Sequence, residues 1–317
     1  MGGFFSRASS FLSDPRLPIY YPFNLARWVS LNSRMDKLDL GSRPELDVLF
    51  TVDLEYDYGS REANLVVPFL KQAKGFFTER GIRATIFMQG GLVADAISHI
   101  RLLGSGHEIG LHGHSHEMWG TAWFVKDAPP PLDVRKNLIA SSLKAFGEAG
   151  LMRPLSFRAP RMVMDDASFR LLESAGFTAD SSFPSYAGGV PLMGSRYGIT
   201  ELPVSFDPKP VFGRSLRARY DVFNVNHIVV REFAGGIAAA AMRVAKAQAL
   251  SGQKPFIVIL SHPWEFFTPP GWVDLKQYGY SGPDNFNLVS DALLELERHF
   301  RVRYATTQEF LQSRSRS

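Results

Sequence analysis

Apolar residues follow two alternating patterns from about residue 47 to the end of the chain. Some segments are short, continuous and rich in β-branched and aromatic residues, as buried strands are. In other segments the apolar residues recur at helical spacing, for example Leu65, Phe69, Ala73 and Phe76, ahead of a closing Gly81. The chain therefore predicts strands and helices in alternation.

The predicted elements have boundaries that follow these patterns. The strands are expected at 46–55, 83–88, 106–112, 154–160, 177–182, 198–206, 255–262 and 301–306. The helices are expected at 63–81, 133–150, 165–176, 235–250 and 286–300, with a short one that begins near 306. Asp133 is expected to cap its helix, and Thr306 with Glu309 forms a capping-box pattern.

Repeating strand–helix units that bury apolar strands predict parallel strands covered by helices, which is an α/β fold. The charged and histidine-bearing motifs follow the predicted strands, and a (β/α) barrel places its chemistry at that end of its strands. We expect the barrel to span residues 47–313. The irregular stretch 184–250 is interpreted as an insertion that shapes the rim.

Residues 1–46 do not follow this alternation, because aromatic and aliphatic residues are interleaved there with arginines and a lysine. Such a mixture suits a membrane interface, where rings lie at headgroup depth and cations meet lipid phosphates. The other interpretation is an N-terminal arm that packs on the barrel. The sequence leaves both interpretations open.

Composition and charge exclude several classes of protein. The chain has 45% hydrophobic and 21% charged residues, an ordinary globular balance, and no cysteine, which excludes disulfides, thiolate metal sites and a cysteine nucleophile. Its net charge of +4 comes without a long Lys/Arg run, so no nucleic-acid partner is expected. No run of about 18 apolar residues and no signal-peptide pattern occurs, so we expect a cytoplasmic protein, either free or peripheral on the inner membrane face.

Histidines concentrate directly after one predicted strand. Four of the eight lie between positions 107 and 116, and three of them form the stretch HGHSH. His112 and His116 are four residues apart and point the same way on a helix or a strand, whereas His114 joins them only if the chain stays extended past Gly113. Imidazoles at this spacing suit Zn²⁺ or a similar divalent metal, so the sequence predicts a metal site.

Acidic residues end the first predicted strand. Asp53 and Glu55 lie two apart and face one side of an extended chain, so one can bind a metal while the other acts on its water. Solvated loop acids are the alternative. Arg158 leaves an apolar strand, where a buried carboxylate such as Asp53 would balance its charge. His262 ends the most hydrophobic strand and can protonate a leaving group.

The motifs TVDLE, HGHSH, FRAP and LSHP, in this order, resemble those of the polysaccharide deacetylase family over roughly residues 47–310. The family consists of metal-dependent hydrolases that remove acyl groups from sugars. The resemblance implies a distorted (β/α) barrel of about seven parallel strands. It also implies a divalent metal, with zinc as the first choice and cobalt, nickel or manganese as alternatives.

The resemblance assigns a role to each motif. It implies that Asp53 is the catalytic base, that His262 is the general acid and that Arg158 belongs to the catalytic group. It implies that the metal ligands are His112 and His116 with a carboxylate.

Three departures from the family pattern bear on these roles. Leu54 stands where many members have the metal-binding aspartate, so Glu55 is the expected ligand and Asp57 its reserve. Gly113 replaces a common Ser or Thr. Asp180 lies in an incomplete fourth motif, which leaves the partner of the general acid open.

The substrate is expected to be an N-acylated amino sugar, most simply N-acetylated. Arg161 stands where the family has a tyrosine and suggests an anionic group near the cleft, while a backbone N–H beside it is expected to stabilise the oxyanion. With the aromatic and basic arm, this favours a lipid-linked sugar or nascent polysaccharide glycolipid at an anionic membrane. Trp264 either stacks on a sugar ring or caps the barrel.

Two other functions stay open. One is hydrolysis of a non-sugar linear or cyclic amide, against which the intact HGHSH argues, because relatives of that kind tend to lose the metal histidines. The other is a non-catalytic module that holds a metal or a sugar.

Overall fold

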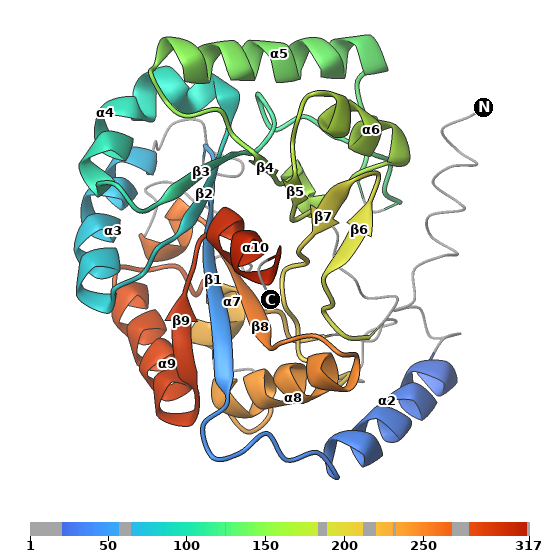
Figure 1. The fold of residues 1–317 in the computed structure, drawn as a ribbon. Coiled ribbons are helices and arrows are strands. Elements are labelled where there is room, and N and C mark those ends of the chain that lie inside the picture. Colours follow the sequence, from blue (N-terminus) through green and yellow to red (C-terminus); the bar gives the residue numbers. More distant parts are fainter. Residues whose placement is uncertain are drawn as a thin grey trace.

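The structure is a computed structural model, and one large sheet organises the part of the chain that it describes. The described residues are 21–56, 65–123, 125–182, 189–211, 220–230, 233–267 and 279–315. The strands are β1 (Glu45–Leu54), β2 (Thr85–Met88), β3 (Glu108–Leu111), β4 (Ser156–Phe157), β5 (Ala179–Asp180), β6 (Gly194–Arg196), β7 (Ile199–Glu201), β8 (Phe256–Ser261) and β9 (Arg301–Tyr304). They are ordered β6-β7-β5-β4-β3-β2-β1-β8, and β9 also pairs with β1 (Figure 1).

The chain after β7 joins the two margins of this sheet. The N–H of Leu202 donates to the carbonyl of Asp180 at 2.8 Å, and the N–H of Ser205 donates to the carbonyl of Val258 in β8 at 3.0 Å. All strand pairs are parallel except β6 with β7, so β1 to β5, β7 and β8 form seven parallel strands around a barrel. The predicted α/β fold, a distorted (β/α) barrel of about seven parallel strands, is confirmed.

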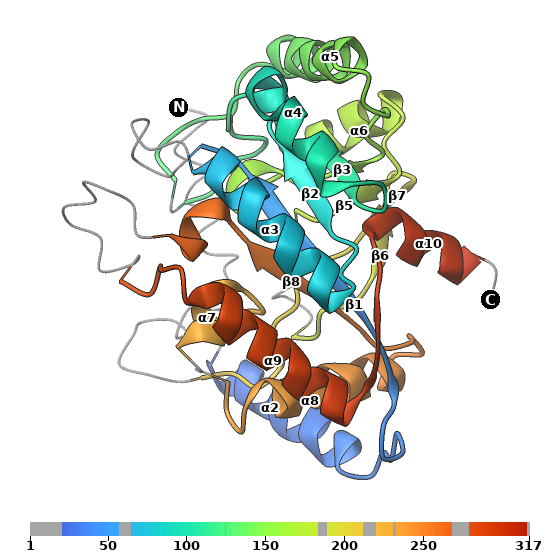
Figure 2. The ribbon, with the colours of Figure 1, turned by 90° about the vertical axis from the view of Figure 1, so that its left-hand side faces the viewer.

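Most of the helices surround the barrel and bury an apolar face toward the strands (Figures 1 and 2). The helices are α2 (Tyr21–Met35), α3 (Val66–Arg80), α4 (Val93–Leu103), α5 (Leu132–Glu148), α6 (Asp166–Ser174), α7 (Val225–Val229), α8 (Ile237–Leu250), α9 (Asn285–His299) and α10 (Thr307–Ser315). By contrast, α2 packs on α8, and α10 closes one end of the barrel. In α3 the buried residues include Phe69, Ala73 and Phe76, and Gly81 ends the helix with a φ of 63°. None of the helices in the described ranges combines the length and apolar character needed to cross a bilayer.

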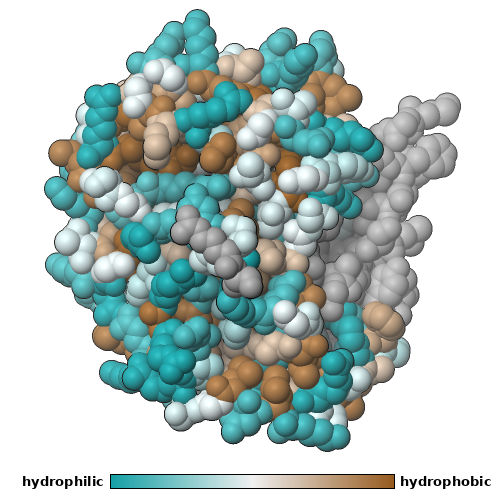
Figure 3. Space-filling view, in the orientation of Figure 1, coloured by the Kyte–Doolittle hydropathy of each residue, from teal (hydrophilic) through white to brown (hydrophobic). Residues whose placement is uncertain are grey.

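The barrel interior is filled at the end where the strands begin. Leu49 of β1, Phe256 and Val258 of β8 and Phe310 of α10 belong to one buried apolar cluster. Helix α10 thus closes this end, which we call the base of the barrel, and Figure 2 shows it at one side of the sheet. The face seen in Figure 3, where α10 lies, carries many hydrophilic residues with apolar ones between them.

A polar network around Glu108, at the start of β3, connects α10 to the base of the barrel. Its Oε2 accepts from the N–H of Gln308 at 2.8 Å, and its Oε1 accepts from the hydroxyl of Ser156. The predicted capping box begins α10 as expected: the N–H of Thr306 donates to Glu309 Oε2 at 3.0 Å, and the Glu309 N–H donates to Thr306 Oγ1 at 3.3 Å.

Two local predictions were wrong or incomplete. Asp133 does not cap α5, because the helix begins at Leu132 after Pro131. This acid lies in the first turn, where its negative charge interacts favourably with the helix dipole. Helix α4 was not predicted, although Val93, Ala96, Ile100 and Leu103 bury its inner face at helical spacing.

The predicted N-terminal arm is described only from residue 21, and residues 1–20 lie outside the described ranges. Helix α2 packs on α8, where Met35 and Ala247 share a buried cluster and Lys246 Nζ donates to the carbonyl of Met35 at 3.1 Å. Helix α8 itself contributes Ala240 and Val244 to the main core. The boundaries of the arm, the barrel and the 184–250 insertion stay predictions.

Candidate active site

Several strands bring the predicted site residues to one end of the barrel, opposite α10. Asp53 lies at the end of β1 and Glu55 directly follows it. His112 follows β3, Arg158 follows β4 and His262 follows β8. Because the strands are parallel, all of these side chains meet at the same rim, as expected for a barrel of this class.

Glu55, His112 and His116 form a compact group of metal-ligand type. Glu55 Oε2 lies 2.9 Å from His112 Nε2 and 2.8 Å from His116 Nε2. The three candidate ligand atoms all lie within 4.8 Å of one another, and Glu55 and His112 are buried. The structure therefore brings together the three residues expected to hold a metal.

The hydrogen bonds of His112 test whether a metal fits this group. Its Nδ1 lies 2.9 Å from the carbonyl oxygen of Arg158. A carbonyl only accepts, so Nδ1 donates, and in the neutral ring Nε2 presents its lone pair to Glu55. A lone pair and a carboxylate oxygen repel each other unless a proton or a metal ion lies between them. Two imidazole nitrogens and one carboxylate oxygen, with one ring fixed by a backbone carbonyl, fit a hydrolytic zinc site.

The electrostatics of the group also favour a cation. Burial alone would raise the pKa of Glu55, but hydrogen bonds from His112 and His116 and their charges lower that pKa far below its ordinary value. Burial would lower the pKa of His112, but the charge of Asp53 and the contact with Glu55 outweigh it and raise that pKa. The site therefore stabilises positive charge between its carboxylates.

A tight turn presents His116 and turns His114 away. Gly113 and His116 both adopt a φ of 65°, and Glu117 Oε1 accepts from the N–H of His114 at 2.9 Å. A Cβ at Gly113 would lie 3.0 Å from Glu117 Oε1, which explains the absence of a side chain there. His114 Nδ1 instead lies 3.0 Å from Ser142 Oγ, outside the metal-type group.

Arg158 is fully buried, and its guanidinium contacts residues of three strands or strand ends. One nitrogen donates to Asp53 Oδ1 at 2.7 Å and to Thr51 Oγ1 at 2.8 Å. The others donate to the hydroxyl and carbonyl of Ser181, and the guanidinium carbon lies 4.4 Å from the ring centroid of Phe87. The pairing with Asp53 is the one expected from the sequence, and it orients that carboxylate.

The second carboxylate oxygen of Asp53, Oδ2, lies between the group of Glu55, His112 and His116 and the imidazole of His262. Asp53 Oδ2 is 3.9 Å from His112 Nε2 and 3.9 Å from His262 Nε2. Burial would lower the pKa of His262, but its hydrogen bond to Glu265 and the charges of Glu265, Asp53 and Glu55 raise that pKa to about 9. These contacts favour the protonated imidazole, which is the form that a proton donor needs.

The remaining predicted residues have different surroundings. Arg161 lies on the rim, 3.4 Å from Asp127 Oδ2, and has a φ of 58°. Trp264 is only 5% exposed and stacks on His262 with ring centroids 4.3 Å apart. A ring so buried offers little surface to a sugar, so the geometry supports a packing role. Asp57 lies outside the described residues.

Sequence reasoning missed Glu265 and Glu117, which hold His262 and the HGHSH turn. Glu265 follows His262 by three residues with a proline between them, which is the spacing of a capping carboxylate and a usable signal. Glu117 bonds the backbone of a turn whose left-handed residues no periodicity indicates. Both residues depend on local turn geometry and not on strand or helix patterns.

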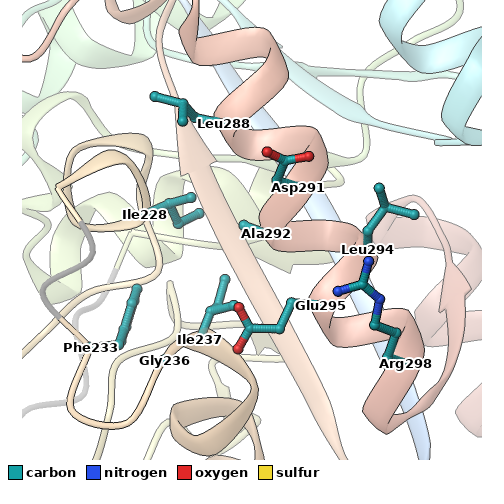
Figure 4. A pocket seen from close by; sticks show the side chains of 10 residues that line it. All are labelled: Ile228, Phe233, Gly236, Ile237, Leu288, Asp291, Ala292, Leu294, Glu295 and Arg298. Carbon is teal, nitrogen blue, oxygen red and sulfur yellow. The ribbon is translucent and has the colours of Figure 1, made fainter.

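A separate pocket lies between α9 and the chain that enters α8 (Figure 4). It has a volume of about 430 Å³, and Asp291, Glu295 and Arg298 are its charged lining residues. Glu295 Oε1 accepts from the N–H of Ala238 at 3.2 Å, so this acid holds the start of α8. The pocket contains none of the predicted site residues.

Comparisons with known proteins agree with this fold. Residues 47–179 match the family model described as polysaccharide deacetylase, which confirms the family resemblance for the stretch that carries the first three motifs. A comparison with curated proteins gave no match.

Two solved structures show the same fold. A putative polysaccharide deacetylase from Mycobacterium smegmatis has a TM-score of 0.56 at 20% identity, covering 88% of this chain and 93% of that one. A probable polysaccharide deacetylase from Pseudomonas aeruginosa has a TM-score of 0.52 at 13% identity, covering 86% of this chain and 91% of that one. At these identities the likeness extends to the fold alone.

Proposed function

We propose that the protein is a metal-dependent hydrolase that removes an N-acyl group, most simply acetyl, from an amino sugar. The observation that carries the proposal is the convergence at one rim of three residues of metal-ligand type, the carboxylate of Asp53 held by Arg158, and the imidazole of His262. The family match over residues 47–179 supports a sugar deacetylase as the class of enzyme. The roles of the individual residues are part of the proposal.

Each residue has a distinct task in this mechanism. Glu55, His112 and His116 would hold a divalent metal, which supplies Lewis acidity toward water and the acyl carbonyl. Asp53, held through Oδ1 by Arg158, accepts the proton of the attacking water at Oδ2.

His262 acts at the other side of the scissile bond. It donates its Nε2 proton to the amide nitrogen as the C–N bond breaks, because an amine leaves poorly unless it is protonated. The products are a carboxylate and the free amino sugar. Donation from a backbone N–H beside Arg161 to the oxyanion stays a prediction.

The substrate is proposed to be lipid-linked and handled at an anionic membrane surface on the cytoplasmic side. Arg161 contributes a cation at the rim, which suits a phosphate-bearing sugar. Phe23, Leu25 and Val29 are exposed on α2, although this helix packs on α8 through its other face. Exposed apolar residues of this kind support a peripheral lipid contact. Co-sedimentation with anionic and with neutral vesicles tests this contact. Absence of binding to both kinds of vesicle would remove the membrane from the proposal.

Acetate release from a panel of soluble and lipid-linked N-acetyl sugars tests the function, with Zn²⁺, Co²⁺, Ni²⁺ or Mn²⁺ added. Asp53→Asn is expected to lower the rate about 10²- to 10⁴-fold, the range for loss of a general base. Asp47→Asn is the matched control, because Asp47 lies on the same strand and is paired with Arg303 and Arg314 at the base. It should retain activity.

Each other result has a defined meaning. Undiminished acetate release by Asp53→Asn would remove this mechanism. Turnover of a linear or cyclic non-sugar amide, without release from any sugar, would replace the substrate class. Metal binding without turnover of any amide would replace the enzyme with a metal-binding module.

A further inference from the structure

The imidazole of His262 is held on its inner side by a carboxylate from its own turn. Glu265, in the short 3-10 helix Pro263–Phe266, is buried, and its Oε2 accepts from the backbone N–H of His262 at 2.8 Å. The same oxygen lies 3.3 Å from His262 Nδ1. A carboxylate only accepts hydrogen bonds, so this contact requires a proton on Nδ1.

Glu265 is itself fixed by the segment that leads into α9. The hydroxyl of Tyr280 donates to Glu265 Oε1 at 2.6 Å, and Asn285 Nδ2 donates to the Glu265 carbonyl at 2.5 Å. Trp264 stacks on the His262 ring at an interplanar angle of 20°. The contact with Glu265 and the stacking of Trp264 therefore fix both the position and the plane of the imidazole.

Among the residues that the structure describes, the charged groups that face His262 come from two sides. Glu265 lies at Nδ1, whereas Asp53 Oδ2, at the end of β1, lies 3.9 Å from Nε2, and Glu55 acts from farther along the same segment. Asp180, the acid that the incomplete fourth motif offered, is instead bonded to the N–H and hydroxyl of Ser182, at 2.9 and 2.6 Å. Of these acids, only Glu265 contacts His262 Nδ1.

We propose that Glu265 is the positioning residue of the general acid. It accepts the Nδ1 proton of His262, which places the transferable proton on Nε2, toward the reacting bond. In this chain the carboxylate that orients the acid thus comes from the turn after β8 and not from β5. The inference rests on the proposed function for the role of His262, but the hydrogen bond itself can be tested without turnover.

The first test is ¹⁵N NMR of the imidazole in the full chain, with and without Zn²⁺. In the wild type, the neutral ring above its pKa should carry its proton on Nδ1, the less common tautomer of free histidine. Glu265→Gln should lower the pKa of His262 from about 9 toward the ordinary 6.5, whereas Asp180→Asn should leave it unchanged. A neutral wild-type ring protonated on Nε2, or a pKa that only Asp180→Asn moves, would overturn the proposal. The tautomer of the His262 ring in the wild type tests the proposal even if Glu265→Gln does not fold.

The second test is the pH profile of deacetylation. Glu265→Gln should lower kcat about 10- to 100-fold, as loss of an orienting partner does, and should change KM little. The basic limb of the pH profile of kcat should move to lower pH, because the pKa of His262 falls. Glu265→Asp, which keeps the charge, should recover part of kcat. A purely structural role would instead lower the amount of active protein without moving the limb, and that result would refute the assignment. Absence of turnover in the wild type would refute the proposed function, while the NMR result still decides on Glu265.

Discussion

Each end of the barrel holds a glutamate in opposite chemical surroundings, Glu108 partly buried at the base and Glu55 buried at the rim. At the base, Glu108 is bonded by neutral groups such as the Ser156 hydroxyl and the Gln308 N–H, and burial raises its pKa. At the rim, Glu55 is bonded by His112 and His116, and these contacts overcome burial and lower its pKa. Burial alone therefore does not mark a reactive acid. The two sites differ in their hydrogen-bond partners: Glu55 is bonded by ionisable imidazoles, whereas Glu108 is bonded by neutral groups that connect α10 to the barrel.

The strand β1 repeats this contrast with its two aspartates. Asp47, near the base, pairs with Arg303 and Arg314, whose side chains are 48% and 14% exposed. Asp53, at the rim, pairs with Arg158, whose side chain is 0% exposed. An ion pair in contact with water has little net effect on stability, whereas one buried charge left without its partner is costly.

The largest effect should come from breaking the buried pair. Arg158→Met leaves Asp53 buried without its cation and should lower the free energy of unfolding by about 3 to 5 kcal/mol. Arg303→Met, at the other end of β1, should lower it by about 1 kcal/mol or less. Urea unfolding of both variants and the wild type measures the difference. Equal losses would show that the two ends do not differ in this respect.

A medium effect should come from loading the rim with metal. Free Zn²⁺ at about one hundred times its dissociation constant should raise the free energy of unfolding by about 2.7 kcal/mol. His116→Ala removes one of the three ligand atoms and should lose most of this gain, while Glu108→Gln, at the base, should keep it. Thermal unfolding with Zn²⁺ and with excess chelator measures it. A gain that survives in His116→Ala would place the metal elsewhere.

The smallest effect should be a pH dependence at the base. Because the folded pKa of Glu108 lies above its ordinary 4.5, the protonated form is favoured on folding. This contribution is fully present below pH 4.5 and is lost as pH rises through the folded pKa. Glu108→Gln cannot ionise, so its stability relative to the wild type should improve as the pH rises from 4 to 8. Urea unfolding across this range tests the sign, which a constant difference would contradict.

Periodicity and strand composition were sufficient for the barrel and for much of the site. The run from Leu46 to Leu54 is buried almost throughout, as a strand covered on both faces must be. His112 and His116 both reach Glu55, but a turn with left-handed residues brings them there and not the helix or strand geometry assumed for their spacing. The role of Arg158 as partner of Asp53 followed from the cost of burying a lone cation.

The parts that the sequence did not reveal depend on turns and on tertiary contacts. Glu265 acts through a backbone turn, and its orientation is fixed by Tyr280 and Asn285, which lie 15 and 20 residues farther along the chain. The buried ring of Trp264 faces His262 and not solvent, which composition cannot indicate. Such contacts require the packed arrangement of β8 and α9, because no local pattern encodes them.

Residue 158 serves the rim twice, with its carbonyl on His112 and its guanidinium on Asp53. A replacement of the side chain that preserves the fold keeps the backbone carbonyl as the acceptor for His112 Nδ1. Under the proposed function, a substitution at Arg158 is therefore expected to impair hydrolysis more than metal binding, because it removes the partner of Asp53 but not the acceptor for His112.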